Sequence, residues 1–279
     1  MTYEKFKKYL EAKLKEELTG YAISFEKNMK VNSFCEYLCI KEWADTSVLE
    51  GFQFDLAELF HTFLKREDFE KIVEMIKESI KITRPEAQNF GKDLLSCPSD
   101  FLITFQAINA EFNKEFLKEV PHITMCDLAL ICRLTKEGSE GIYSTVLTNR
   151  LLQEFGWSKE KLFTEKWLGT NALLEFETLD VSFGAPFNLY AVTNKAKLNG
   201  AACIFFPTVL EQARKKLGYD FYIILSSIHE ILLIEKDLEE VEAYKKMIKA
   251  ANQNREVVAE NEILSYNLYE FVNGKVSIV

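Results

Sequence analysis

The longest apolar runs of this chain stop at five or six residues, and this limit constrains the fold more than any other feature. They are Leu128 to Cys132, Ala201 to Phe206 and Phe221 to Leu225. A membrane-spanning helix needs about 18 apolar residues, whereas a buried strand needs only about four to eight. The sequence therefore predicts short buried strands and no membrane-spanning helix.

Amphipathic helices are predicted on both sides of these strands in the sequence. Apolar residues recur at helical spacing in residues 3–19, 53–64, 67–82, 85–95, 148–155, 159–173, 208–217 and 237–252. In the segment 208–217, Thr208 and Glu211 have the spacing of a capping box. Gly218 follows as a helix stop, because glycine adopts the left-handed conformation that often ends a helix.

Segments rich in β-branched and aromatic residues predict strands joined mostly by short turns. They lie at 22–31, 34–43, 101–108, 124–134, 142–147, 189–193, 201–206, 221–225 and 231–234. Asn273-Gly274 is the strongest hairpin signal, because both residues tolerate the positive φ of a type I′ turn. We expect an α+β fold in which a mixed, largely antiparallel sheet is covered by amphipathic helices.

A domain boundary is expected near residues 176–186, which contain Gly184 and Pro186 and show little periodicity. This boundary gives an N-terminal helical and hairpin portion with central strands at 1–175. A C-terminal α/β portion follows at 187–279. One continuous domain is the alternative, since a chain of 279 residues suits either organisation.

Charge and cysteine usage limit the function classes. A formal net charge of −9 argues against binding to nucleic-acid backbones, which relies on a basic surface.

The N-terminus lacks the apolar segment of a signal peptide, so we expect a cytoplasmic protein. Six cysteines without a CxxC pair are expected to be small buried hydrophobes in a reducing compartment. No metal and no cofactor are predicted.

The clearest candidate site follows the strand at 221–225 and contains Ser226, Ser227, His229 and Glu230. A serine nucleophile needs a base within hydrogen-bond reach. On an extended backbone Ser227 and His229 would face one side and Glu230 the other, which argues against an adjacent triad. A turn closed by backbone hydrogen bonds is the main interpretation, and a catalytic or ligand-binding site is the alternative.

Two weaker candidates lie elsewhere. Asn194, Asn199 and Gly200 flank a small-residue loop that could bring backbone N–H groups close to a ligand, although its spacing is not that of a phosphate loop. A zinc site would have to bring His122 and His229 together with a carboxylate such as Asp127 or Glu230. We favour a tight turn in the first case and no metal in the second.

Several segments carry a family resemblance. They are Asn109, Asn113, Val120-Pro-His122, Tyr190-Ala-Val-Thr-Asn194, Gly200-Ala-Ala-Cys-Ile204, Asp220 to Glu230 and Glu262-Ile-Leu-Ser265. In these residues the chain resembles an uncharacterised domain-of-unknown-function family of bacterial proteins, mostly from Firmicutes. In that family the serine motif normally follows a proline, where this chain has Leu225. The resemblance implies a shared fold and a shared C-terminal motif, and it transfers no catalytic residue.

Together these patterns favour a noncatalytic protein, namely a cytoplasmic interaction or regulatory protein that acts by binding another protein. The basis is the lack of cofactor motifs, the acidic balance and the 22 phenylalanines. The alternative is a small hydrolase or ligand-binding enzyme centred on His229, with Ser226 or Ser227 as nucleophile or ligand contact. Neither a membrane nor a nucleic acid is an expected partner.

Overall fold

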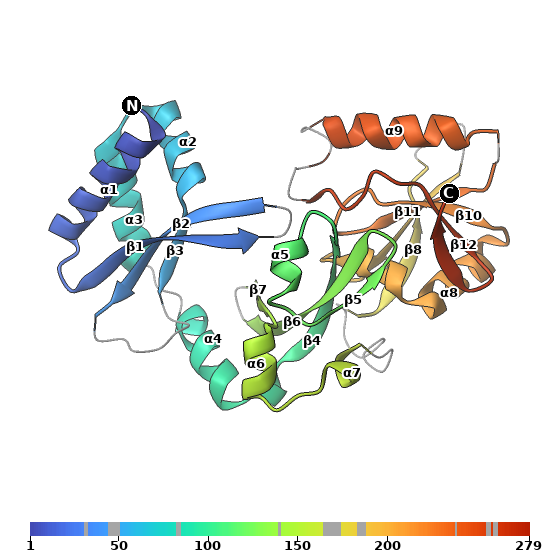
Figure 1. The fold of residues 1–279 in the computed structure, drawn as a ribbon, viewed down its shortest axis with the longest axis horizontal. Helices are drawn as coiled ribbons and strands as arrows, with labels where there is room; N and C mark the ends of the chain where they lie inside the picture. The colour runs from blue at the N-terminus through green and yellow to red at the C-terminus, as the bar shows by residue number, and fades with distance from the viewer. Residues whose placement is uncertain are drawn as a thin grey trace. The chain divides into compact units, whose positions relative to one another are not determined.

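The computed structural model describes residues 1–30, 33–43, 51–81, 85–138, 141–163, 174–182, 188–237, 239–254, 258 and 262–279 (Figure 1). Its contacts divide the chain into two compact units. Unit 1 comprises Met1–Phe101 and Glu137–Tyr143, and unit 2 comprises Leu102–Lys136 and Ser144–Val279. Helices combine with antiparallel sheets, so the predicted α+β class is confirmed. None of the described helices has the length and apolar content to cross a membrane.

Unit 1 packs three helices onto a three-stranded sheet of order β1-β2-β3. Its elements are α1 (Tyr3–Glu17), β1 (Tyr21–Lys30), β2 (Ser33–Glu42), β3 (Phe52–Asp55), α2 (Leu56–Arg66), α3 (Phe69–Lys81), α4 (Pro85–Ser96) and the 3-10 helix η1 (Pro98–Asp100). The core contains Phe6 and Leu10 from α1, Leu38 from β2 and Ile72 and Ile76 from α3. The i, i+4 spacing on the helices and the alternation along β2 produce this core.

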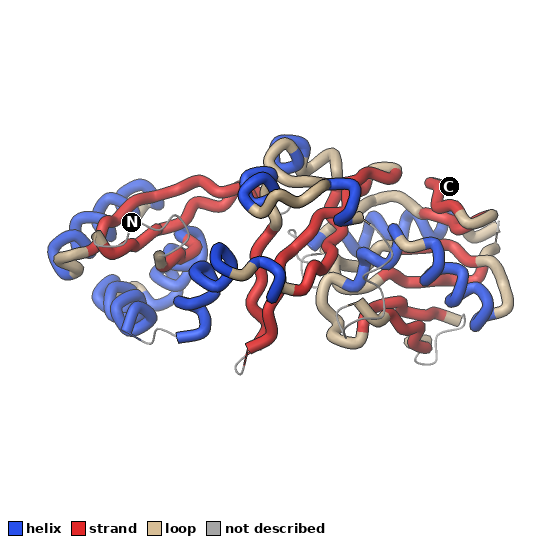
Figure 2. Tube along the Cα trace, turned by 90° about the horizontal axis from the view of Figure 1, so that it is seen from below, coloured by secondary structure: helices blue, strands red, loops and turns tan. Residues whose placement is uncertain are grey.

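Unit 2 contains two antiparallel sheets, whose strands Figure 2 shows in red. The first has β4 (Leu102–Asn109), β6 (Leu128–Gly138) and β5 (His122–Met125) in that order, and β7 (Gly141–Val146) also pairs with β6. The second has the order β13-β12-β10-β11-β9-β8. Its strands are β8 (Phe176–Asp180), β9 (Leu189–Asn194), β10 (Phe221–Ile224), β11 (Ile231–Glu235), β12 (Tyr269–Val272) and β13 (Lys275–Ile278).

Helices cover both faces of the six-stranded sheet, with α9 (Val241–Gln253) above it and α8 (Pro207–Leu217) below it in Figure 1. Tyr222 and Ile224 of β10 share a buried cluster with Ile248 of α9. Phe221 lies on the other face and stacks on Phe271 of β12. Successive residues of a strand point to opposite faces, so the apolar run of β10 fills both layers. The remaining elements are α5 (Lys114–Leu117), α6 (Asn149–Glu154), α7 (Lys159–Leu162) and the 3-10 helix η3 (Gly200–Phe205).

The predicted hairpins are confirmed by the strand registers. β1 pairs with β2 from Tyr21↔Glu42 to Lys30↔Ser33. At the other end of the chain, Asn273 and Gly274 have φ values of 51° and 76° and join β12 to β13. The two positive φ angles match the type I′ turn that twists with the strands.

Other predictions of secondary structure are wrong in detail. Residues 201–205 belong to η3 and not to a strand. The segment 124–134 is two strands because the chain turns at Cys126, whose φ is 54°. Residues 53–55 belong to β3, not to a helix. The Thr208 cap is absent because Pro207 occupies the first helical position, so α8 begins earlier and Phe206 is its N-cap.

Two predicted segments lie partly outside the described residues. The helix expected at 159–173 is seen as α7 at Lys159–Leu162, and residues 164–173 lie outside the described part. The segment 176–186, expected to be a loop, begins instead as β8, which pairs with β9 from Phe176↔Asn194 to Asp180↔Tyr190. Residues 183–187 again lie outside the described part.

The cysteines divide into buried and exposed thiols. Cys39, Cys132 and Cys203 are buried, whereas Cys97 and Cys126 are exposed. Burial raises the pKa of Cys39 to about 11 and also raises the pKa of Cys132 and Cys203. Desolvation disfavours the thiolate, so these three residues serve as small hydrophobic side chains, as predicted.

Candidate functional site

The predicted site at Ser226 to Glu230 is the loop between β10 and β11. The Ser226 and Ser227 hydroxyls donate to the same carboxylate oxygen of Glu230, Oε1, over 3.2 and 3.3 Å. The backbone N–H of His229 donates to Ser227 Oγ over 3.0 Å. A serine hydroxyl that accepts from the backbone two residues later stabilises a tight turn. These residues therefore form the turn that the sequence predicted.

The His229 imidazole accepts a hydrogen bond on one nitrogen and has a carboxylate near the other. Its Nδ1 lies 3.3 Å from the backbone N–H of Asn199. An N–H group can only donate, so Nδ1 is the acceptor in this hydrogen bond. The other nitrogen, Nε2, lies 3.8 Å from Glu262 Oε1, and both side chains are 33% exposed. The ring is thus bonded to a backbone amide and lies near a carboxylate without a hydrogen bond to it.

The structure brings the first and second predicted sites together. Thr193 Oγ1 donates to the carbonyl of His229 over 2.7 Å, and the N–H of Ala201 donates to the carbonyl of Ile228 over 3.2 Å. Asn199 has a left-handed backbone with a φ of 56°. This turn places its N–H on His229 and brings Gly200 against the His229 carbonyl. We call Thr193, Asn199, Gly200, His229 and Glu262 the His229 cluster.

Asn194 stabilises the loop after β9, which is part of this cluster. It is buried with 2% exposure, its amide Nδ2 donates to the carbonyl of Leu198 over 2.7 Å, and its Oδ1 accepts from the N–H of Leu198 over 3.1 Å. A side-chain amide that satisfies both backbone groups of one residue fixes the loop after β9. These two hydrogen bonds stabilise the loop after β9.

These contacts define what the His229 cluster can do chemically. Catalysis by a serine requires its hydroxyl to reach a base. In the described residues, both hydroxyls donate to Glu230, and neither bonds to the His229 ring. These contacts hold the two loops against each other. The hydrolase alternative stays a prediction, and it would need the ring to leave Asn199.

A second polar site lies at the turn between β5 and β6 and centres on Asp127. Its Oδ2 accepts from Ser265 Oγ over 2.7 Å and from Asn267 Nδ2 over 3.0 Å. Its Oδ1 accepts from the hydroxyl of Tyr269, which is fully buried. One carboxylate thus satisfies three side-chain donors that come from the segment before β12 and from β12 itself.

Buried asparagines extend this site. Asn109 Nδ2 donates to the carbonyl of Leu264 over 2.8 Å, and Asn252 Nδ2 donates to the carbonyl of Ser265 over 2.9 Å. Asn113 Nδ2 donates to the carbonyl of Asn109 over 2.7 Å. All three asparagines are at most 4% exposed. We use the name Asp127 network for Asp127, Asn109, Asn113, Asn252, Ser265, Asn267 and Tyr269.

Sequence reasoning found only part of this network. Asn109, Asn113 and Ser265 carry the family resemblance, and Asp127 was considered only as a partner of His122. The structure places His122 Nδ1 2.9 Å from the carbonyl of Val120 instead. His61 is exposed on α2. Within the described ranges, no three His, Cys, Asp or Glu side chains are grouped as metal ligands would be.

Tyr269 makes the Asp127 network sensitive to alkaline pH. Burial raises the pKa of Tyr269 strongly, and its hydrogen bond to the Asp127 carboxylate raises it further. Below the unfolded tyrosine pKa of about 10 both states are protonated, so this stabilisation is complete there. It is lost as the pH rises above that value, because only the unfolded state then releases the proton.

We expect Tyr269→Phe to destabilise the protein by about 1–2 kcal/mol at pH 8, since the buried bond is lost. Above pH 10 the wild type should lose up to about 1.4 kcal/mol of stability per pH unit from this group, and the variant should lack that contribution. Urea unfolding between pH 8 and pH 11 measures both values. Identical pH slopes for the two proteins would show that Tyr269 ionises freely in the folded state.

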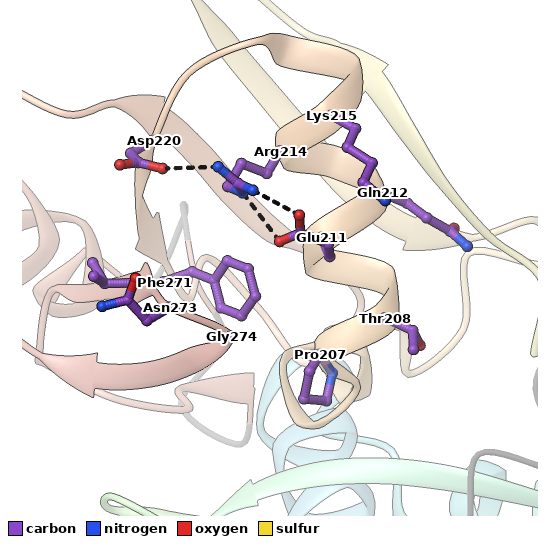
Figure 3. Close-up of a pocket in the computed structure, with 11 residues that line it drawn as sticks. Pro207, Thr208, Glu211, Gln212, Arg214, Lys215, Asp220, Phe271, Asn273 and Gly274 are labelled. Atoms are coloured by element: carbon purple, nitrogen blue, oxygen red, sulfur yellow. Dashed lines mark hydrogen bonds and ion pairs between the residues drawn. The ribbon is translucent and has the colours of Figure 1, made fainter.

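A hollow of 700 Å³ lies between α8 and the turn of the β12–β13 hairpin (Figure 3). Arg214 extends from α8 across it, 2.7 Å from Glu211 and 3.8 Å from Asp220. The ring of Phe271 faces the same space. Two cations, Arg214 and Lys215, and two carboxylates, Glu211 and Asp220, line this hollow, so it offers little net charge to a ligand.

A second hollow of 460 Å³ lies beside the Asp127 network. It is lined by Lys245, Lys249, Tyr266, Asn267, Leu268 and Val279. Asn267 belongs to both features, because its side chain bonds to Asp127. The lining carries two lysines and no acidic side chain, so a cationic hollow adjoins a rigid polar network. We call it the lysine pocket.

Comparison with known proteins gives one match. The model of a family described as a family of unknown function (DUF5688) matches residues 3–183 and 176–273. No curated protein and no solved structure matches the chain. The two matched ranges cover most of both units and contain the His229 cluster and the Asp127 network.

Proposed function

We propose that this chain, which belongs to the DUF5688 family of unknown function, is a noncatalytic protein that acts by binding another protein. The observation that carries the proposal is a set of exposed apolar side chains attached to the Asp127 network. Phe112, Tyr266 and Ile278 are 53%, 44% and 44% exposed. We call these three residues the Asp127 surface.

Each residue of the Asp127 surface is tied to the network through its backbone. The N–H of Phe112 donates to Asn109 Oδ1 over 2.9 Å. Tyr266 lies between Ser265 and Asn267, which both bond to Asp127. Ile278 is paired with Tyr269 across the β12–β13 hairpin, so their side chains share one face.

A rigid backbone beneath exposed apolar side chains favours binding. Ordering a flexible loop costs free energy on association, whereas a preorganised loop avoids this cost. Aromatic side chains also supply much of the binding energy at protein interfaces. Exposed apolar groups that are held in place by buried hydrogen bonds are therefore suited to recognise a partner.

The His229 cluster supports a noncatalytic role in another way. The hydroxyls of Ser226 and Ser227, in the same loop as His229, donate to Glu230, and the ring of His229 accepts from Asn199. These bonds use the groups that a nucleophile and a base would need. We assign the cluster the task of holding the β10–β11 loop against the loop after β9.

The proposal includes the location that the sequence predicts, namely the cytoplasm of a bacterial cell. The chain has six cysteines and no CxxC pair, and Cys39, Cys132 and Cys203 are buried thiols. A reducing cytosol keeps thiols in this state, whereas an oxidising compartment favours disulfides. Fractionation of cells of the organism that encodes the chain would test the location directly.

The experiment that tests the proposal uses the tagged full chain to capture a partner from a lysate of that organism. The captured protein is identified, purified and titrated by calorimetry against wild type and a Phe112→Ala/Tyr266→Ala variant. We expect the double variant to bind at least about tenfold more weakly, because two aromatic contacts are lost.

Leu64→Ala is the matched control for this experiment. Leu64 is 51% exposed but lies on α2 of unit 1, far in sequence from the Asp127 surface. It should leave the affinity unchanged. Equal binding by wild type and the double variant, or an equal loss in the control, would contradict the proposed surface.

A further inference from the structure

We infer that the partner presents an acidic segment to the lysine pocket while its apolar side chains contact the Asp127 surface. This inference rests on the proposed function and specifies the chemistry of the partner. It begins from the two lysines of α9 that line the pocket, Lys245 and Lys249. Four residues separate them, so they project from the same face of the helix.

The charges of these lysines are only weakly compensated within the protein. Lys245 Nζ lies 3.6 Å from Glu242 Oε1, and the Glu242 side chain is 77% exposed. Such an exposed pair adds little stability and is easily exchanged. Among the described residues, no carboxylate is within ion-pair distance of Lys249. A partner carboxylate can therefore pair with both ammonium groups at little cost.

The hollow beside α8 provides a contrast within the same unit. There Arg214 is paired with Glu211 and Asp220, so positive and negative groups line one space. The side chains that line the lysine pocket include two lysines and no carboxylate, and no ion pair joins either lysine to the main-chain carboxylate of Val279 among the described residues. On a chain of net charge −9, a local cationic pocket attracts anions that the rest of the surface repels.

The residues that line the lysine pocket favour a peptide segment as its ligand. Tyr266 is 44% exposed and lines the pocket, whereas Leu268 is fully buried at its inner wall. Tyr266 also belongs to the Asp127 surface, so charge recognition and apolar contact are continuous. A segment with acidic and apolar side chains in alternation can use both at once, whereas a small anion would use only the lysines.

Two fluorescein-labelled peptides test the inference by fluorescence anisotropy. One is a short amphipathic peptide of Glu, Leu and Phe, and the other has Lys in place of every Glu. We expect the full chain to bind the acidic peptide and not the basic one. Lys245→Glu/Lys249→Glu should weaken binding of the acidic peptide by at least about tenfold, because attraction becomes repulsion.

Lys246→Glu is the matched control, because it makes the same charge change on α9 at a position that does not line the pocket. It should alter the affinity by less than about twofold at physiological salt, where distant surface charges are screened. Circular dichroism of each variant verifies that the fold is retained.

The outcomes separate this inference from the proposed function. If the acidic peptide fails to bind, or binds equally to Lys245→Glu/Lys249→Glu, the acidic partner is excluded. If the basic peptide binds instead and Phe112→Ala/Tyr266→Ala abolishes its binding, the proposed surface stands and only the partner's charge is wrong. If binding of either peptide is independent of Phe112 and Tyr266, the proposed surface fails as well.

Discussion

Gly200→Ala is expected to destabilise the protein by about 4 kcal/mol, since it forces a methyl group into a closed space and breaks a buried hydrogen bond. A Cβ atom at Gly200 would lie 2.3 Å from Thr193 Oγ1, 2.4 Å from the His229 carbonyl oxygen and 2.9 Å from the Asn194 backbone nitrogen. Two of these atoms are backbone and cannot move aside without displacing a strand or a loop. The bond between Thr193 and His229 would therefore be lost.

Gly156→Ala provides the comparison that isolates packing. Gly156 has a φ of +63° and open space around its Cα. Alanine at this position should reduce the stability by only about 1 kcal/mol, because it must adopt a left-handed backbone. Gly200 does not have a positive φ, so the destabilisation expected from Gly200→Ala is steric. Urea unfolding of both variants should give the larger loss for Gly200→Ala. Equal losses would mean that the two loops of the His229 cluster do not pack as described.

Asp127→Ala should cost about 3 kcal/mol, because hydrogen bonds to a charged acceptor contribute about 1.5–3 kcal/mol each and their donors are left without it. Tyr269 and Ser265 are at most 1% exposed, so water cannot replace the carboxylate fully. Asp127 itself is half-buried, which allows some solvent to enter and keeps the loss below the sum of three bonds. Urea unfolding at pH 7 measures the difference.

Asp220→Ala is the control for this change. The Asp220 side chain is 54% exposed and only 3.8 Å from Arg214, an arrangement that stabilises by less than about 1 kcal/mol. Its removal should be nearly neutral. A neutral Asp127→Ala would contradict the network, and with it the rigid base on which the Asp127 surface depends.

Local rules were enough to predict much of the fold. Asn273-Gly274 and Gly218 adopt the positive φ values that their positions predicted. The strand predicted at 201–206 was wrong because a short apolar run is compatible with any buried element. What makes this segment a 3-10 helix is the close approach of Gly200 to His229, a contact 29 residues away in sequence.

The candidate site was predictable only where neighbours in sequence are neighbours in space. Ser227 and His229 form the expected turn because they are two residues apart. The contact of Asn199 with His229 joins two strands that only the fold places side by side. Asp127 and its partners Ser265, Asn267 and Tyr269 are separated by 138 to 142 residues. No local sequence pattern predicts contacts between residues so far apart in the chain.

The most direct test of the central claim compares two double variants in one calorimetric titration of the purified partner. Ser226→Ala/Ser227→Ala alters the predicted catalytic motif, and Phe112→Ala/Tyr266→Ala alters the Asp127 surface. The account predicts that the serine variant, once shown to be folded, binds within about twofold of wild type, whereas the aromatic variant loses at least about tenfold. A folded serine variant that loses the partner, beside an aromatic variant that keeps it, would contradict the account.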